Sequence, residues 1–156
     1  MANTRYIKDI QLDLPEEEVQ GIIRRFLNQG QFEIRSNFGG MEYYESGISI
    51  CHRFFQYRYK GGCLHIEAWL GQGPKNVEVG LTGWGGIMET STYLSYVHQL
   101  LEELLALLPK GNPVCMALRE EMRRERKHSK AGVVFMVVML CVFAAMMIVA
   151  KSTGYR

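Results

Sequence analysis

A continuous apolar run near the C-terminal end constrains this chain more than any other feature. Residues 131–150 read AGVVFMVVMLCVFAAMMIVA and contain no charged residue, Pro, Asn or Gln. At about 1.5 Å rise per residue, a helix of this length spans a hydrocarbon core of roughly 30 Å. A buried core helix normally keeps a polar edge, which this run lacks. The run therefore predicts a transmembrane helix.

Basic residues lie unequally around this run. Six precede it, whereas only Lys151 and Arg156 follow it. Because positive residues favour the cytoplasmic side, we expect a single-pass, tail-anchored protein of the cell membrane, with a cytoplasmic N-terminal domain and residues 151–156 on the far side. The preceding basic residues are also candidates for binding anionic lipid headgroups of the bilayer. They are Arg119, Arg123, Arg124, Arg126, Lys127 and Lys130.

The rest of the chain has the composition of a folded, mildly acidic domain. Of all residues 47% are apolar and 22% are charged, which excludes a disordered tail. Residues 1–112 carry ten Lys and Arg against thirteen Asp and Glu. Glutamates also interrupt the basic run, and no aromatic residue interleaves with it, so we expect no nucleic-acid partner.

The cysteines predict free thiols. Cys51, Cys63, Cys115 and Cys141 form no CxxC pair, and their spacing does not assemble a zinc site. The N-terminal residues contain no hydrophobic stretch that resembles a signal peptide. We therefore expect a reducing compartment, with no metal and no cofactor.

Two amphipathic helices are predicted on either side of a strand-rich region. Asp13 and Glu16 form a capping-box pattern, and Gly30 is a typical left-handed helix terminator. Between them one apolar stripe consists of Val19, Ile22, Ile23, Phe26 and Leu27. A second stripe, preceding a break at residues 109–113, consists of Leu94, Val97, Leu101, Leu104, Leu105 and Leu108. Asn112 and Pro113 then predict the start of a further helix.

Gly61 and Gly62 predict a tight hairpin turn. Such a turn requires positive φ angles, which glycine adopts freely, and it sets the register of the two strands. One sheet face then carries Phe54, Gln56, Arg58 and Lys60 opposite Trp69, Glu67, His65 and Cys63. The other face is apolar and requires a covering helix, with Phe55, Tyr57 and Tyr59 opposite Ala68, Ile66 and Leu64.

These elements predict a two-layer α+β fold in β-α-β4-α order, with an antiparallel sheet and two packing helices, followed by a stalk and the transmembrane helix. We expect the α+β domain at residues 1–110, a basic solvated helical stalk at 111–130 and the membrane helix at 131–150. The element order looks like the TATA-binding-protein-like architecture, which is an analogy of fold alone.

Short motifs also resemble a group of uncharacterised bacterial membrane-anchored proteins. The resemblance rests on Arg5-Tyr6-Ile7-Lys8, on residues 62–69 (GCLHIEAW) and on residues 79–83 (VGLTG). It covers roughly residues 4–108. The group has no assigned activity, so the resemblance implies no functional residue.

The hairpin carries the candidate site residues. Cys63, His65 and Glu67 alternate along one strand, and together they offer a thiol, an imidazole and a carboxylate. Alternate residues stand nearly 7 Å apart and point in parallel, which disfavours convergence on one metal ion. His98 lies on an apolar helix face, where a hydrogen-bonded core histidine is the ordinary interpretation.

The leading interpretation is a membrane-anchored cytoplasmic interaction domain without catalysis, whose partner is another protein or a second copy. Its binding surface comprises Phe54, Gln56, Arg58, His65, Glu67 and Trp69. One alternative is a membrane-tethered enzyme or metal site using Cys63, His65 and Glu67. Another is an accessory subunit of a larger membrane complex.

Overall fold

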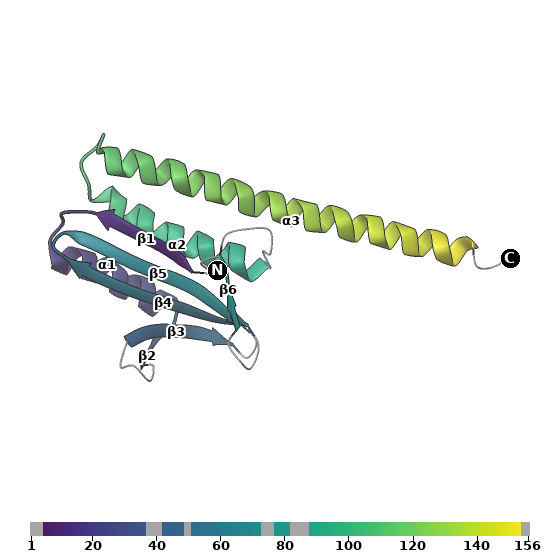
Figure 1. Cartoon of the computed structure of the whole chain (residues 1–156), viewed down its shortest axis with the longest axis horizontal. Coiled ribbons are helices and arrows are strands. Elements are labelled where there is room, and N and C mark those ends of the chain that lie inside the picture. The colour runs from purple at the N-terminus through teal and green to yellow at the C-terminus, as the bar shows by residue number, and fades with distance from the viewer. Residues whose placement is uncertain (1–4, 37–41, 49–50, 73–76, 82–87, 154–156) are drawn as a thin grey trace.

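The computed structural model describes residues 5–36, 42–48, 51–72, 77–81 and 88–153, and its fold is α+β (Figure 1). Five strands follow the first helix, rather than the four expected. The elements in chain order are β1 (Tyr6–Gln11), α1 (Glu16–Gln29), β2 (Glu33–Ser36), β3 (Glu42–Ile48), β4 (Cys51–Lys60), β5 (Cys63–Gln72), β6 (Val77–Val79), α2 (Met88–Ala106) and α3 (Pro113–Thr153).

All strand pairs in the six-stranded sheet are antiparallel, in the order β1-β5-β4-β3-β2. The short β6 also pairs with β5. Because β1 pairs with residues 63–68 of β5 and β6 pairs with residues 70–72, both strands lie along the same edge of β5. Along this edge β1 and β6 therefore follow one another, on either side of the level of Trp69.

The predicted hairpin register is confirmed. Lys60 pairs with Cys63, Arg58 with His65, Gln56 with Glu67, and Phe54 with Trp69. Gly61 and Gly62 have φ angles of 60° and 77°, the positive values that a two-residue turn requires. Alternation along both strands then separates an apolar face from a mixed polar face.

Helices α1 and α2 cover the apolar face. The predicted stripe of α1 is buried in full, and Phe26 lies 4.9 Å from Phe55 of β4 between ring centroids. On α2, Tyr93 is completely buried, and its hydroxyl donates a 2.8 Å hydrogen bond to the carbonyl oxygen of Phe54. No described helix or strand packs on the other face, which we call the open face.

The ends of α1 differ from the prediction. Pro15 occupies the N-cap position without a side-chain hydrogen bond, because Asp13 has a φ of 51° and accepts a hydrogen bond from Gln11 instead. At the other end Gly30 has a φ of −81°, so it is not a left-handed terminator. Glycine is required at position 30 by close packing instead, since a Cβ atom there would lie 2.5 Å from the ring of Phe32.

The first part of α3 packs on the domain, so the expectation of a solvated stalk is corrected. Asn112 caps this helix through a 2.9 Å hydrogen bond from the Val114 amide to its side chain, as predicted. Cys115, Leu118 and Met122 are buried at helical spacing. They cover the side of α2 that carries His98 and Leu105, since the Cys115 thiol donates to the Leu105 carbonyl oxygen and His98 faces Glu125 of α3.

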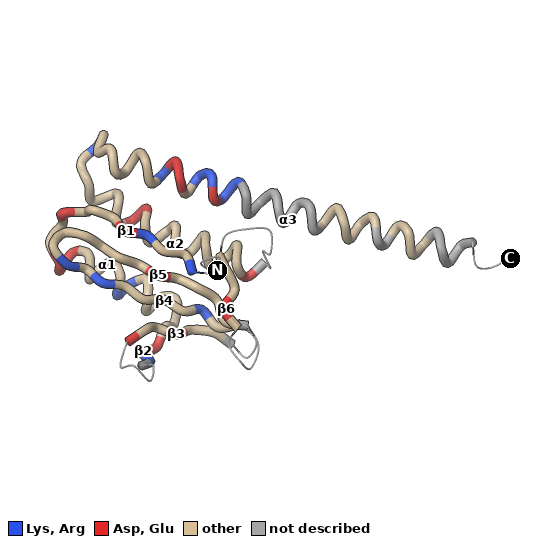
Figure 2. Tube along the Cα trace, viewed as in Figure 1, with Lys and Arg blue, Asp and Glu red and all other residues tan. Residues whose placement is uncertain are grey.

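The predicted transmembrane helix is also corrected. Within the described part of the chain, no helix combines the length and the apolar character that crossing a membrane demands. Residues 131–150 form no separate element but continue α3, whose first half carries the charged residues seen in Figure 2. This finding overturns the predicted single-pass, tail-anchored topology and the cell-membrane localisation.

Candidate functional site

The six residues predicted as a binding surface all lie on the open face, but the structure buries two of them. Phe54 and Trp69 are only 5% and 7% exposed. Their rings stack at 5.3 Å between centroids, and Tyr43 of β3 packs against both. The Arg5 guanidinium lies over the indole, 4.0 Å from the ring centroid. The prediction that Phe54 and Trp69 are exposed is therefore wrong. They belong to an aromatic cluster that lies beneath an arginine.

A chain of charged side chains crosses the open face beside this cluster. His65 faces Asp9 through Nδ1 at 2.7 Å and Glu67 through Nε2 at 3.2 Å. Arg5 then donates hydrogen bonds to Glu67 at 2.9 Å and to Glu78 at 2.6 Å. We call these five residues the face network, and it joins β1, β5 and β6.

Electrostatics in the face network favour the charged forms. The hydrogen bond to Asp9 raises the pKa of His65, with a further contribution from Glu67, although burial acts in the opposite direction. Burial opposes ionisation of Glu67, but hydrogen bonds from Arg5 and His65 outweigh it and lower the pKa of this carboxyl group. Each charge is thus stabilised by a neighbour on another strand or two positions along β5.

This arrangement does not assemble the alternative site of Cys63, His65 and Glu67. Both ring nitrogens of His65 are hydrogen-bonded to carboxylates, Nδ1 to Asp9 and Nε2 to Glu67. Among the described residues, no group of three His, Cys, Asp or Glu side chains is arranged to hold a metal ion.

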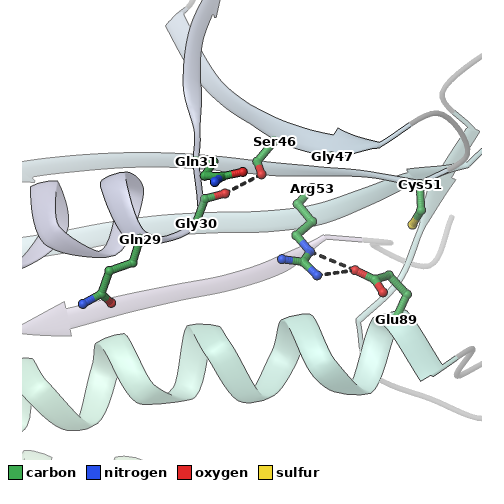
Figure 3. Close-up of a pocket in the computed structure, with 8 residues that line it drawn as sticks. All are labelled: Gln29, Gly30, Gln31, Ser46, Gly47, Cys51, Arg53 and Glu89. Atoms are coloured by element: carbon green, nitrogen blue, oxygen red, sulfur yellow. Dashed lines mark hydrogen bonds and ion pairs between the residues drawn. The ribbon is translucent and has the colours of Figure 1, made fainter.

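A second polar region is a cavity of about 400 Å³ between the other sheet face and the helices (Figure 3). It lies where the end of α1 approaches β3, β4 and the start of α2. Arg53 Nε donates a 2.9 Å hydrogen bond to Glu89, and the Ser46 hydroxyl donates a 2.5 Å bond to the carbonyl oxygen of Gly30. The lining residues are Gln29, Gly30, Gln31, Ser46, Gly47, Cys51, Arg53 and Glu89.

The chemistry of this cavity does not point to catalysis. Burial raises the pKa of the Cys51 thiol, whereas a nucleophilic cysteine requires a lowered pKa. Arg53 and Glu89 form an ion pair with each other, which engages the charges that a substrate would use. The cavity therefore carries a structural ion pair between β4 and α2.

The basic residues predicted to meet lipid headgroups lie on α3, where several contact other protein groups. Arg119 pairs with Glu102 of α2, and Arg123 and Arg124 both pair with Glu120. Lys127 is exposed, and the side chain of Lys130 lies outside the described residues. Contact of this segment with anionic lipids stays a prediction.

Arg126 belongs to a second network, which we call the clasp, together with Tyr6, Lys8, His98 and Glu125. Glu125 accepts hydrogen bonds from Lys8 at 2.9 Å and Tyr6 at 3.2 Å, and His98 Nε2 lies 2.9 Å from it. Arg126 donates to His98 Nδ1 at 3.2 Å, and Lys8 also reaches Glu121 at 2.6 Å. The clasp joins β1, α2 and α3 on the side opposite the open face.

Sequence reasoning missed Arg5, Asp9 and Glu78 because they lie on strands remote from the hairpin. The pairing of β1 with β5 places Asp9 opposite His65, and the pairing of β6 places Glu78 opposite Gly71. The alternation of Arg5, Ile7 and Asp9 along β1 was a usable signal. It identifies one strand face but not the strand beside it.

Comparison with family models, with curated proteins and with solved structures found no match to this chain. The resemblance to uncharacterised bacterial proteins and the fold analogy therefore stay predictions.

Proposed function

We propose that this chain is a non-catalytic protein-binding module whose interface is the open face. The observation that carries the proposal is an uncovered sheet face in which stacked aromatic residues lie beneath Arg5 and beside the face network. Aromatic residues and arginine are enriched at protein interfaces, where a desolvated centre is surrounded by a polar rim.

The arrangement of charge supports a protein partner over a nucleic acid. Glu67 and Glu78 engage Arg5, and Asp9 faces His65, so the cations of the network are matched by carboxylates. Binding to a phosphate backbone requires a surplus of cations along the surface. A mixed surface with neighbouring charges of both signs instead favours a partner with a complementary pattern.

A photo-crosslinking residue placed in the full chain tests this proposal. Gln56 lies at the centre of the open face, and Asn28 on the exposed side of α1 provides a control position that also carries an amide side chain. We expect covalent protein adducts from position 56 and not from position 28. Equal labelling from both positions, or none from position 56, would contradict an interface on the open face.

A further inference from the structure

Each ring nitrogen of His65 lies against a carboxylate. Nδ1 is 2.7 Å from Oδ1 of Asp9 on β1, and Nε2 is 3.2 Å from Oε1 of Glu67, two residues along β5. An ionised carboxylate only accepts hydrogen bonds, and a neutral imidazole has one N–H donor whereas an imidazolium has two. The protonated form of His65 therefore satisfies both carboxylates, and the neutral form satisfies only one.

Deprotonation of His65 leaves one carboxylate of the face network without a donor. The remaining N–H donates to Asp9 or to Glu67, and the lone pair of the other ring nitrogen then faces the second carboxylate. Glu67 keeps a hydrogen bond from Arg5, whereas Asp9 has no other side-chain partner among the described residues. In the isolated chain water replaces the lost donor, since the side chain of Asp9 is 69% exposed and that of His65 is 35% exposed. The isolated chain therefore tolerates both forms.

The surroundings of His65 on the open face favour the protonated form. The charged or titratable residues that face it are Asp9 on β1, Cys63 and Glu67 on β5, and Arg58 and Lys60 on β4. Arg58 lies directly opposite His65 and opposes a further positive charge, but its side chain is exposed and screened by water. The hydrogen bonds to Asp9 and Glu67 act at contact distance, so they outweigh this repulsion and raise the pKa of His65.

We propose that the open face binds its partner in a pH-dependent manner, with protonated His65 as the form that binds. This inference rests on the proposed function. A partner that covers the open face removes the water around Asp9 and His65, so a carboxylate without a donor stays desolvated in the complex. Binding therefore favours the protonated imidazole. The affinity is highest below the pKa that His65 has in the free chain, and it falls as the pH rises through the higher pKa in the complex.

Two variants remove this titration with opposite expected results. The amide of His65→Gln has a donor and an acceptor, so like the neutral imidazole it leaves one carboxylate without a donor. The amide of Asp9→Asn donates to Nδ1 of a neutral His65 or accepts from a protonated one, so the network is satisfied in both states. His52→Gln is the matched control, because His52 lies on the same sheet face with its Nδ1 2.8 Å from Glu45.

The test uses the photo-crosslinking residue at position 56 of the full chain, in an extract of its source cells. Adducts are quantified after brief irradiation at about pH 5.5 and about pH 9, on either side of the ordinary histidine pKa of about 6.5. The parent chain and His52→Gln should give about tenfold more adduct at the lower pH, because one hydrogen bond to a charged group in an interface changes the affinity by about tenfold or more. His65→Gln should give little adduct at either pH. Asp9→Asn should give as much adduct at the higher pH as the parent chain gives at the lower pH.

The gain expected for Asp9→Asn at the higher pH is decisive, since misfolding of a variant cannot produce it. Absence of this gain would overturn the inference. Adduct from the parent chain that is equal at the two pH values or greater at the higher one, or a pH dependence that persists in His65→Gln, would overturn it too. Each of these results leaves the proposed function intact, because position 56 still forms adducts. If position 56 gives no adducts at either pH, the proposed function and this inference both fail.

Discussion

Two histidine–carboxylate networks lie on opposite faces of strand β1. The face network attaches to the odd-numbered residues Arg5 and Asp9, whereas the clasp attaches to the even-numbered Tyr6 and Lys8. The histidines differ most, since the side chain of His98 is 0% exposed and that of His65 is 35% exposed. The same chemistry therefore operates in two very different environments.

This difference determines what each network contributes. Exposed ion pairs are worth roughly 0–1 kcal/mol, because water solvates the separated charges almost as well. Loss of a hydrogen-bond partner by a fully buried polar group such as the His98 imidazole costs about 1–3 kcal/mol, because that group stays desolvated. The clasp therefore stabilises the position of α3, while the face network arranges charges on a surface with little effect on stability.

Truncation within α3 should have the largest effect and tests the boundary of the domain. A chain that ends at Lys110 loses three buried side chains, each worth about 1.5–3 kcal/mol, and leaves His98 without Glu125. We expect its unfolding free energy to fall by about 5 kcal/mol or more, or the chain to aggregate. A chain that ends at Lys127 should unfold cooperatively in urea. Equal stability of the two would show that residues 1–110 complete their own core.

Within the clasp, Glu125→Ala should destabilise the chain by about 3 kcal/mol, because the fully buried imidazole of His98 loses its carboxylate partner. Burial opposes ionisation of Glu125, yet hydrogen bonds from His98 and Lys8 lower its pKa, so this residue is charged at neutral pH. Glu121→Ala is the matched control, since Glu121 binds the same lysine but its side chain is 53% exposed. It should cost less than about 1 kcal/mol in urea unfolding. Similar losses of unfolding free energy for both variants would show that the burial of Glu125 does not determine its contribution.

Neighbouring positions of β5 separate the two sheet faces. Ile66→Ala removes a fully buried side chain beneath the helices and should cost about 2–5 kcal/mol. His65→Ala, on the opposite face, should cost less than about 1 kcal/mol. Trp69→Ala belongs with Ile66, at about 3 kcal/mol, because Tyr43 and Arg5 bury its ring. Thermal unfolding followed by circular dichroism measures the loss of stability of each variant. A loss for Trp69→Ala as small as that for His65→Ala would show that the indole is exposed.

The smallest expected effect is the pH dependence of the face network. The hydrogen bond to Asp9 raises the pKa of His65 above the ordinary histidine pKa of about 6.5. The protonated imidazole therefore contributes its full stabilisation of the folded chain when the pH is below about 6.5. This contribution is lost as the pH rises through the raised pKa of the folded state. Solvent screening keeps it below about 0.5 kcal/mol. An NMR titration of His65 should show a higher pKa in the parent chain than in Asp9→Asn, and equal values would exclude Asp9 as the cause.

Local rules in the sequence determined the hairpin, the helix stripes and the start of α3. Gly61 and Gly62 set the register of β4 and β5, because a two-residue turn leaves a single alignment of the strands. The apolar spacing of α1 identified its buried side. Asn112 capped α3 as predicted, since this hydrogen bond involves only residues two positions apart.

Only the tertiary structure decided which distant segments lie together. The alternation along β1 does not reveal that β5 is its neighbour, so the sequence did not join Asp9 to His65 or Arg5 to Trp69. Residues 131–150 were interpreted from their own hydrophobicity and from the basic residues before them, whereas the packing of the first part of the same helix on α2 could not be read from the sequence. Backbone geometry and side-chain periodicity are local properties, whereas burial depends on the surface that a remote element covers.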